Sequence, residues 1–170
     1  MLNYFNRNGN NHVNVVSLLQ SFPYFNDFAR NELRAFARIV YVRWFRKDEV
    51  IYQENDHGIG MYFIQKGSVK IFKNSQLNGR EQITTLIEHD FFGEQSLFDD
   101  KERTETALAL EECCLIGVFR PDLLNFIDRK PKLGNKILMK LAQIIDARLH
   151  QTTDELTEMK DKLSNSDIIR

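Results

Sequence analysis

Between residues 40 and 119, the hydrophobic side chains recur in short runs separated by turn residues, and this pattern restricts the fold more than any other feature. The first run, residues 40–45, is rich in the β-branched and aromatic side chains that favour strands. The strongest hairpin signal between two runs is Asn78-Gly79. Further runs cover residues 50–52, 61–64, 69–73, 82–87, 106–110 and 114–119. Short strands at such spacing predict a sandwich, a barrel or a jelly roll.

Helical spacing replaces the strand pattern on both sides of this region. Before it, apolar residues at positions 13, 16, 19 and 22 predict one helix, and Asp27 is the expected cap of a second helix that carries Phe28, Leu33, Phe36 and Ala37. After it, Pro121 suits the first turn of a helix that carries Leu123 and Phe126. The sequence therefore predicts a mainly β domain with flanking helices.

Pro131 opens a final segment whose apolar residues continue at spacings of three or four as far as Leu163. This spacing predicts one helix of about 30 residues, too long to be covered by a single small β domain. Because the apolar stripe continues past Leu149, we expect a partner helix from a second copy of the chain, and hence a homodimer. The expected organisation is a mobile tail at residues 1–13, a domain at 14–130, a long helix at 131–163 and a tail at 164–170.

Charge and hydrophobicity argue against several classes of partner. The net charge is −1, which gives no strong attraction to nucleic acid or to an anionic membrane. No apolar run approaches the roughly 20 residues that span a membrane, and the N-terminus lacks the apolar core of a secretion signal. Cys113 and Cys114 are adjacent, so on a strand they point to opposite faces and are poorly placed to bridge each other. We therefore expect reduced thiols in a cytoplasmic protein.

Residues 91–104 carry the strongest functional pattern. Gly93 permits a tight turn and close backbone approach, and the short helix expected after it offers N–H groups to an anion near Ser96. Arg103 can hold a phosphate through two parallel hydrogen bonds. Glu94 repels a phosphate, but it can accept a hydrogen bond from a neighbouring sugar hydroxyl. We therefore expect a phosphate clamp and a sugar acceptor within one segment.

This segment resembles the phosphate-binding cassette of cyclic nucleotide-binding domains, in which Phe-Gly-Glu is followed by a short helix and then by Arg-Thr/Ser-Ala. Residues 60–64 and 67–71 resemble a second motif of that family, and the order of elements matches over residues 14–163. The resemblance implies a double-stranded β-helix, or jelly roll, with flanking helices and a long C-terminal dimerisation helix. It also implies a non-enzymatic receptor that binds a cyclic nucleotide and signals through the dimer helix to a protein partner. The ligand-binding residues implied within the cassette are Gly93, Glu94, Gln95, Ser96, Arg103 and Thr104.

The last helix resembles the dimer helix of the bacterial catabolite activator group. Thr152 aligns with the position that hydrogen-bonds the purine within one subunit, and Thr153 aligns with the position that reaches the purine from the partner. This alignment favours cyclic AMP over cyclic GMP as the ligand, whereas Thr104 suits either. The activator group continues into a helix-turn-helix domain, while this sequence ends at Arg170, so we expect no binding of nucleic acid.

The sequence departs from the family pattern at several positions. Asp48, Asn55 and His89 replace glycines at strand turns, and Asp and Asn tolerate a left-handed backbone better than His does. Glu105 replaces the alanine that follows Arg-Thr, and a carboxylate there weakens phosphate binding unless it points into solvent or pairs with a cation such as Lys101. The alternative hypothesis is therefore a degenerate domain that acts as a ligand-independent protein-interaction module.

An enzyme on a similar β-roll would need clustered metal ligands, usually two histidines one residue apart with a third. The histidines at positions 12, 57, 89 and 150 are scattered, and no serine or cysteine lies in a recognisable nucleophile motif. We therefore expect neither a metal nor enzymatic activity.

Overall fold

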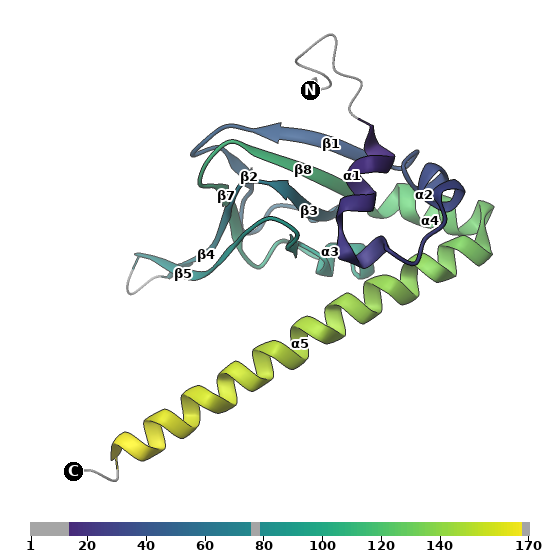
Figure 1. Cartoon of the computed structure of the whole chain (residues 1–170). Coiled ribbons are helices and arrows are strands. Elements are labelled where there is room, and N and C mark those ends of the chain that lie inside the picture. The colour runs from purple at the N-terminus through teal and green to yellow at the C-terminus, as the bar shows by residue number, and fades with distance from the viewer. Residues whose placement is uncertain (1–13, 76–78, 168–170) are drawn as a thin grey trace. The chain divides into compact units, whose positions relative to one another are not determined.

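The computed structural model describes residues 14–75 and 79–167, so the tail expected at residues 1–13 lies outside the described part. The chain divides into two units between Arg129 and Lys130, a β domain with short helices and a single long helix (Figure 1). The elements of the first unit are α1 (Val15–Ser21), η1 (Pro23–Phe25), α2 (Arg30–Phe36), β1 (Val40–Phe45), β2 (Val50–Tyr52), β3 (Gly60–Lys66), β4 (Val69–Ser75), β5 (Gly79–Leu86), β6 (Phe91–Phe92), α3 (Gln95–Phe98), β7 (Thr106–Ala109), β8 (Cys113–Phe119) and α4 (Arg120–Arg129). The second unit holds α5 (Pro131–Asp167), which continues four residues beyond the end expected at 163.

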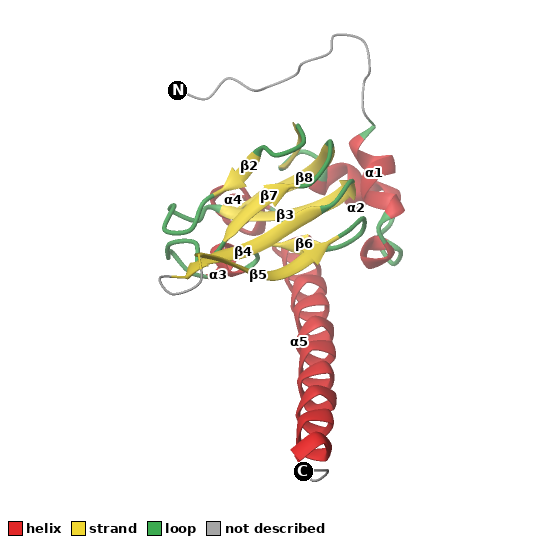
Figure 2. Ribbon diagram, turned by 90° about the vertical axis from the view of Figure 1, so that its left-hand side faces the viewer, coloured by secondary structure: helices red, strands yellow, loops and turns green. Residues whose placement is uncertain are grey.

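The strands of the described residues form two antiparallel four-stranded sheets (Figure 2). One sheet has the order β1-β8-β3-β6 and the other has the order β2-β7-β4-β5. Most strands that are neighbours in the sequence, such as β1 and β2, thus lie in different sheets, as in the jelly roll that the sequence predicts, whereas β4 and β5 pair within one sheet. The β4–β5 hairpin pairs Val69 with Leu86 and Ser75 with Gly79, while Asn78 of the predicted turn lies outside the described residues.

Side-chain alternation along β3 divides the core into two parts. Tyr62 stacks on Phe92 with 5.5 Å between ring centroids, in a buried cluster drawn from both sheets. Phe63 points to the opposite face, where its ring lies 5.6 Å from the rings of Phe22 and Phe25. There α1, η1 and α2 cover the first sheet, at the end of the strands away from the β4–β5 hairpin (Figures 1 and 2). The two aromatic layers fix β3 and β6, and β6 begins the segment with the functional pattern.

Within the described residues, three turns adopt the left-handed backbone at residues that are not glycine. Asp48, Asn55 and His89 have φ angles of 63°, 69° and 71°, so the sheets tolerate the three replacements, as the sequence predicts. His89 is the least favourable of the three, and its backbone is held because its N–H donates to the carbonyl of Ile64 at 2.9 Å. Its ring packs edge-on against Phe22 at 5.4 Å, which adds a packing contact to this turn.

Helix boundaries agree with the sequence at the prolines and differ at Asp27. Pro121 lies in the first turn of α4, and Pro131 is the first residue of α5. The cap predicted at Asp27 is wrong, because α2 begins at Arg30 and the Glu32 carboxylate accepts a hydrogen bond from the Ala29 N–H at 2.8 Å.

Two properties of the described residues bear on function. None of their helices combines the length and the hydrophobicity that crossing a membrane requires. Among the same residues, no group of three or more His, Cys, Asp or Glu side chains could hold a metal ion.

Candidate ligand-binding site

The backbone at Gly93 determines how the segment after β6 begins. Gly93 has a φ angle of +73°, which residues other than glycine rarely adopt. A Cβ atom there would lie 2.5 Å from Nη1 of Arg103 and 3.3 Å from the carbonyl oxygen of Gly60. Gly93 therefore supplies both the turn and the close approach that the sequence predicts.

Helix α3 and the loop between β2 and β3 hold each other in place. Ser96 is buried, and a Cβ atom on Gly58 would lie only 2.0 Å from the Ser96 hydroxyl oxygen. The backbone continues this contact, because Gly58 N–H donates to the Lys101 carbonyl at 3.2 Å and Arg103 N–H donates to the Asp56 carbonyl at 2.7 Å. The chain around Arg103 is thus attached to the β2–β3 loop by the main chain, independently of any ligand.

The Arg103 side chain is buried and its orientation is fixed. It is 7% exposed, and Nη1 donates to the Gly93 carbonyl at 3.0 Å while Nη2 donates to the Gly60 carbonyl at 2.6 Å. The guanidinium carbon lies 4.0 Å from the centroid of the Tyr52 ring, in cation–π geometry. A guanidinium has more N–H donors than these two bonds use, so Arg103 can still donate to an anion.

A cavity of about 20 Å³ brings the predicted cassette residues together. Its volume is that of about one water molecule, so a larger ligand has to displace part of the wall. A second, more open hollow of about 670 Å³ shares Glu102, Arg103 and Thr104 with the cavity. The cavity is lined by Tyr52, Gly93, Glu94, Gln95, Ser96, Asp99, Glu102, Arg103, Thr104 and Glu105. All six residues predicted within the cassette are among them.

The charges around the cavity are mostly negative, with four carboxylates and one guanidinium among its lining residues. Asp99 is compensated by Lys101, whose Nζ lies 2.8 Å from its carboxylate. Glu105 is half-buried and lies on the cavity wall, so it does not point freely into solvent. The structure therefore excludes full exposure of the Glu105 carboxylate. Lys101, the cation named as a possible partner of Glu105, pairs with Asp99.

Tyr52 is a cavity residue that the sequence analysis missed. It is 7% exposed, and among the described residues its hydroxyl has no hydrogen-bond partner. Burial and the nearby Glu105 carboxylate raise the pKa of this hydroxyl, an effect that Arg103 partly opposes. The strand pattern alone places Tyr52 in a core, because alternation does not distinguish a core-facing side chain from one that borders a cavity.

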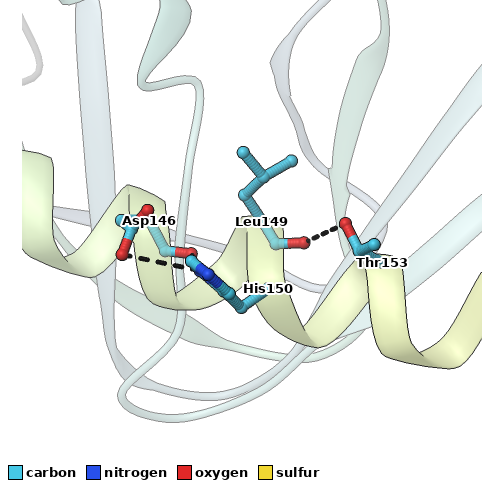
Figure 3. A network of polar contacts seen from close by, with 4 residues as sticks. All are labelled: Asp146, Leu149, His150 and Thr153. Carbon is cyan, nitrogen blue, oxygen red and sulfur yellow. Dashed lines mark hydrogen bonds and ion pairs between the residues drawn. The ribbon is translucent and has the colours of Figure 1, made fainter.

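Thr152 and Thr153 are exposed residues of α5, in the second unit of the chain. The Thr153 hydroxyl donates to the Leu149 carbonyl one turn earlier, at 2.8 Å (Figure 3). On the same turns, Nδ1 of His150 lies 2.9 Å from the carbonyl oxygen of Asp146, and the bond raises the pKa of His150. The predicted contacts of both threonines with a purine stay predictions.

Known proteins resemble this chain in sequence and in structure. Residues 42–130 match the family model of the cyclic nucleotide-binding domain. The chain is 30% identical over 135 residues to the cyclic AMP receptor protein of Thermus thermophilus, covering 79% of this chain and 60% of that protein. It is 29% identical over 127 residues to the cGMP-dependent protein kinase of Toxoplasma gondii, covering 74% of this chain and 12% of the kinase. A solved cyclic nucleotide-binding domain from Methylobacillus flagellatus superposes with a TM-score of 0.73 and 25% identity, covering 83% of this chain and 79% of that one. The chain thus spans 60% or less of the length of these two sequence relatives.

Proposed function

This chain belongs to the cyclic nucleotide-binding domain family, and from that premise we propose that it is a non-enzymatic receptor for cyclic AMP that signals through a dimer of α5 to a protein partner. The observation that carries the proposal is the buried Arg103 beside the cavity, which is held in one orientation by the carbonyls of Gly93 and Gly60. Its remaining N–H groups would donate to the cyclic phosphate. Because the guanidinium is already oriented, little side-chain entropy is lost on binding.

The neighbouring residues would hold the rest of the nucleotide. Glu94 would accept a hydrogen bond from the ribose 2′-hydroxyl, and Thr104 would donate to the phosphate. The backbone N–H of Gln95, where α3 begins, would complete the proposed phosphate site, and the Ser96 N–H would join it by exchanging its 3.3 Å bond to the Gly93 carbonyl. The preference for cyclic AMP is supported by the alignment of Thr152 and Thr153 and by the similarity to a cyclic AMP receptor protein.

Calorimetric titration with cyclic AMP and with cyclic GMP tests the proposal. We expect saturable binding of both nucleotides at one site per chain, with cyclic AMP binding more tightly. 5′-AMP serves as the control, because it has the same base and sugar without the cyclic phosphate. The absence of binding of either cyclic nucleotide at millimolar concentration would contradict the receptor proposal.

Glu94→Gln should weaken cyclic AMP binding by roughly 1–3 kcal/mol, because a neutral amide replaces a charged acceptor of the ribose hydrogen bond. A 2′-deoxy cyclic nucleotide should lose a similar amount against the unchanged protein. Titration of both ligands against both proteins forms a double-mutant cycle, and the two losses should not add because they remove the same contact. Full additivity would show that Glu94 has a structural role in the cassette.

Large apolar side chains on α5 support the proposed dimer. Leu149, Leu156, Met159 and Leu163 are 51–66% exposed within the single chain. Leu149, Leu156 and Leu163 are separated by seven residues, and Met159 lies between them at the spacing of a second seam position. These residues are arranged as the apolar seam of a parallel two-stranded coiled coil, which would bury them against a second copy.

Leu156→Glu should convert the proposed dimer into a monomer, because it places two like charges opposite each other in the seam. Light scattering should give about twice the 20.0 kDa chain mass for the unchanged protein and the single-chain mass for the variant. Thr157→Glu is the matched control, since residue 157 is exposed and lies outside the seam. A single-chain mass for the unchanged protein at tens of micromolar would contradict the dimer. That concentration is about the dissociation constant of a weak interface.

A second candidate function is a ligand-independent interaction module, and the position of Glu105 favours it. The half-buried Glu105 carboxylate lines the same cavity as Arg103. A negative charge there repels a phosphate, and the low polarity of a partly buried site strengthens the repulsion. The β domain and α5 would then assemble with partners without a nucleotide.

A further inference from the structure

The Tyr52 hydroxyl is buried and has no hydrogen-bond partner among the described residues, and Tyr52 is one of the residues that line the cavity. A buried hydroxyl without a hydrogen-bond partner destabilises a fold, so the unpartnered Tyr52 hydroxyl requires an explanation. The cavity of about 20 Å³ has room for one small polar group beside it.

The Tyr52 ring cannot easily turn its hydroxyl away from the cavity. One face is covered by the Arg103 guanidinium at 4.0 Å, and the Phe92 ring packs at 5.9 Å. The rest of the side chain belongs to the core cluster that both sheets build. The ring is therefore held against Arg103, and this fixes the position of its hydroxyl as a donor.

The surroundings also keep this hydroxyl protonated. Burial raises its pKa most, and the carboxylates of Glu105 and Glu94 raise it further, although neither accepts a hydrogen bond from it. Tyr52 is thus a neutral O–H donor at physiological pH. In a cavity with four carboxylates, such a donor attracts an anionic oxygen without adding negative charge.

We propose that Tyr52 is a ligand-recognition residue of this site, whose hydroxyl donates a hydrogen bond to a phosphate oxygen of the bound cyclic nucleotide, next to Arg103. This inference rests on the proposed receptor function. The phosphate is the expected acceptor rather than the ribose, because the hydroxyl and the guanidinium belong to stacked groups that face the same small cavity. Tyr52 and Arg103 together form a neutral and a charged donor for one anion.

Tyr52→Phe removes only the hydroxyl and keeps the ring that stacks with Arg103. Affinity for cyclic AMP should fall about 10- to 100-fold, as expected for a lost hydrogen bond to a charged group. The unfolding temperature of the ligand-free variant should stay the same or rise, since an unpartnered buried hydroxyl is gone. Tyr62→Phe is the matched control: Tyr62 is also buried and packs on Phe92, yet it does not line the cavity, so affinity should stay within twofold, about 0.4 kcal/mol.

Titration with 2′-deoxy cyclic AMP assigns the contact to one part of the ligand. The loss caused by Tyr52→Phe should be as large for this ligand as for cyclic AMP, because the phosphate is unchanged. If the loss disappears, the hydroxyl contacts the ribose and the phosphate assignment is wrong.

The remaining outcomes separate this inference from the proposed function. Equal affinities of Tyr52→Phe and the unchanged protein would overturn the role of Tyr52 and leave the receptor function standing. A variant that does not fold, or unfolds at a clearly lower temperature, would show that the hydroxyl makes a structural bond, which also overturns the inference. Failure of the unchanged protein to bind any cyclic nucleotide would overturn the receptor function and this inference together.

Discussion

Arg103→Ala should abolish cyclic nucleotide binding, with an expected loss of about 3–5 kcal/mol measured by calorimetric titration. The size of this effect follows from burial: the side chain is 7% exposed, so the charged donor acts in a region of low polarity. Alanine would also leave the carbonyls of Gly93 and Gly60 without their donor. We therefore expect a lower unfolding temperature in addition to lost binding.

One further variant separates charge from geometry, and a second serves as a control. Arg103→Lys keeps the positive charge, but lysine has no planar fork that reaches Gly93, Gly60 and a phosphate at once. The affinity of this variant should therefore lie between those of the unchanged protein and Arg103→Ala. Arg120→Ala is the matched control, because Arg120 lies outside the cavity and pairs with Asp100 at 3.6 Å. Its effect on affinity should stay within about 0.5 kcal/mol. An Arg103→Ala protein that folds and binds cyclic AMP as tightly as the unchanged one would refute the phosphate role of Arg103.

The strand pattern was sufficient to predict the β domain, because alternation and turn chemistry act locally. Tyr62 and Phe63 illustrate the reason: adjacent side chains on β3 enter two different aromatic layers, so both had to be apolar. The left-handed turns at Asp48, Asn55 and His89 followed from the resemblance to a family with glycines at these positions, because residue type alone would not predict one at His89. The prediction of a helix cap at Asp27 was wrong, because α2 begins only at Arg30 and the Glu32 carboxylate accepts the hydrogen bond from the Ala29 N–H.

The residues of the candidate site were predictable, but their contacts were not. The sequence placed Gly93, Ser96 and Arg103 in one segment, and the structure brings them to one cavity. It gave no indication that Arg103 donates to the carbonyl of Gly60, because that contact joins residues 43 positions apart. For the same reason Tyr52 was missed: its relation to Arg103 depends on how β2 faces the cassette across the fold.

Glu105 is the residue on which the two candidate functions disagree. Its carboxylate lies on the cavity wall and is close enough to raise the pKa of the Tyr52 hydroxyl. For a carboxylate and a phosphate about 6 Å apart, at an effective dielectric constant of about 20, the repulsion is roughly 3 kcal/mol. A receptor can tolerate this repulsion only if Arg103 and the neutral donors of the cassette exceed it. A degenerate site would not bind.

Glu105→Gln should therefore strengthen cyclic AMP binding by as much as about 3 kcal/mol, because the variant keeps the shape of the side chain and removes its charge. If the unchanged protein binds, titration should show a gain in affinity over an existing signal. If the domain is degenerate, the same variant should bind cyclic AMP where the unchanged protein does not. Glu102→Gln is the matched control, since Glu102 lines the same cavity but is exposed, so its effect should stay within about 0.5 kcal/mol.

Comparison of the unfolding temperatures shows whether Glu105→Gln also disturbs the fold, which would obscure a gain in affinity. Equal affinities of Glu105→Gln and the unchanged protein would mean that the carboxylate turns away from the phosphate when the nucleotide binds. Should neither protein bind either cyclic nucleotide at millimolar concentration, Glu105 would not be the cause of the lost function. The cavity would then be closed by its own geometry, with Arg103 held permanently by the Gly93 and Gly60 carbonyls, and the domain would act as an interaction module.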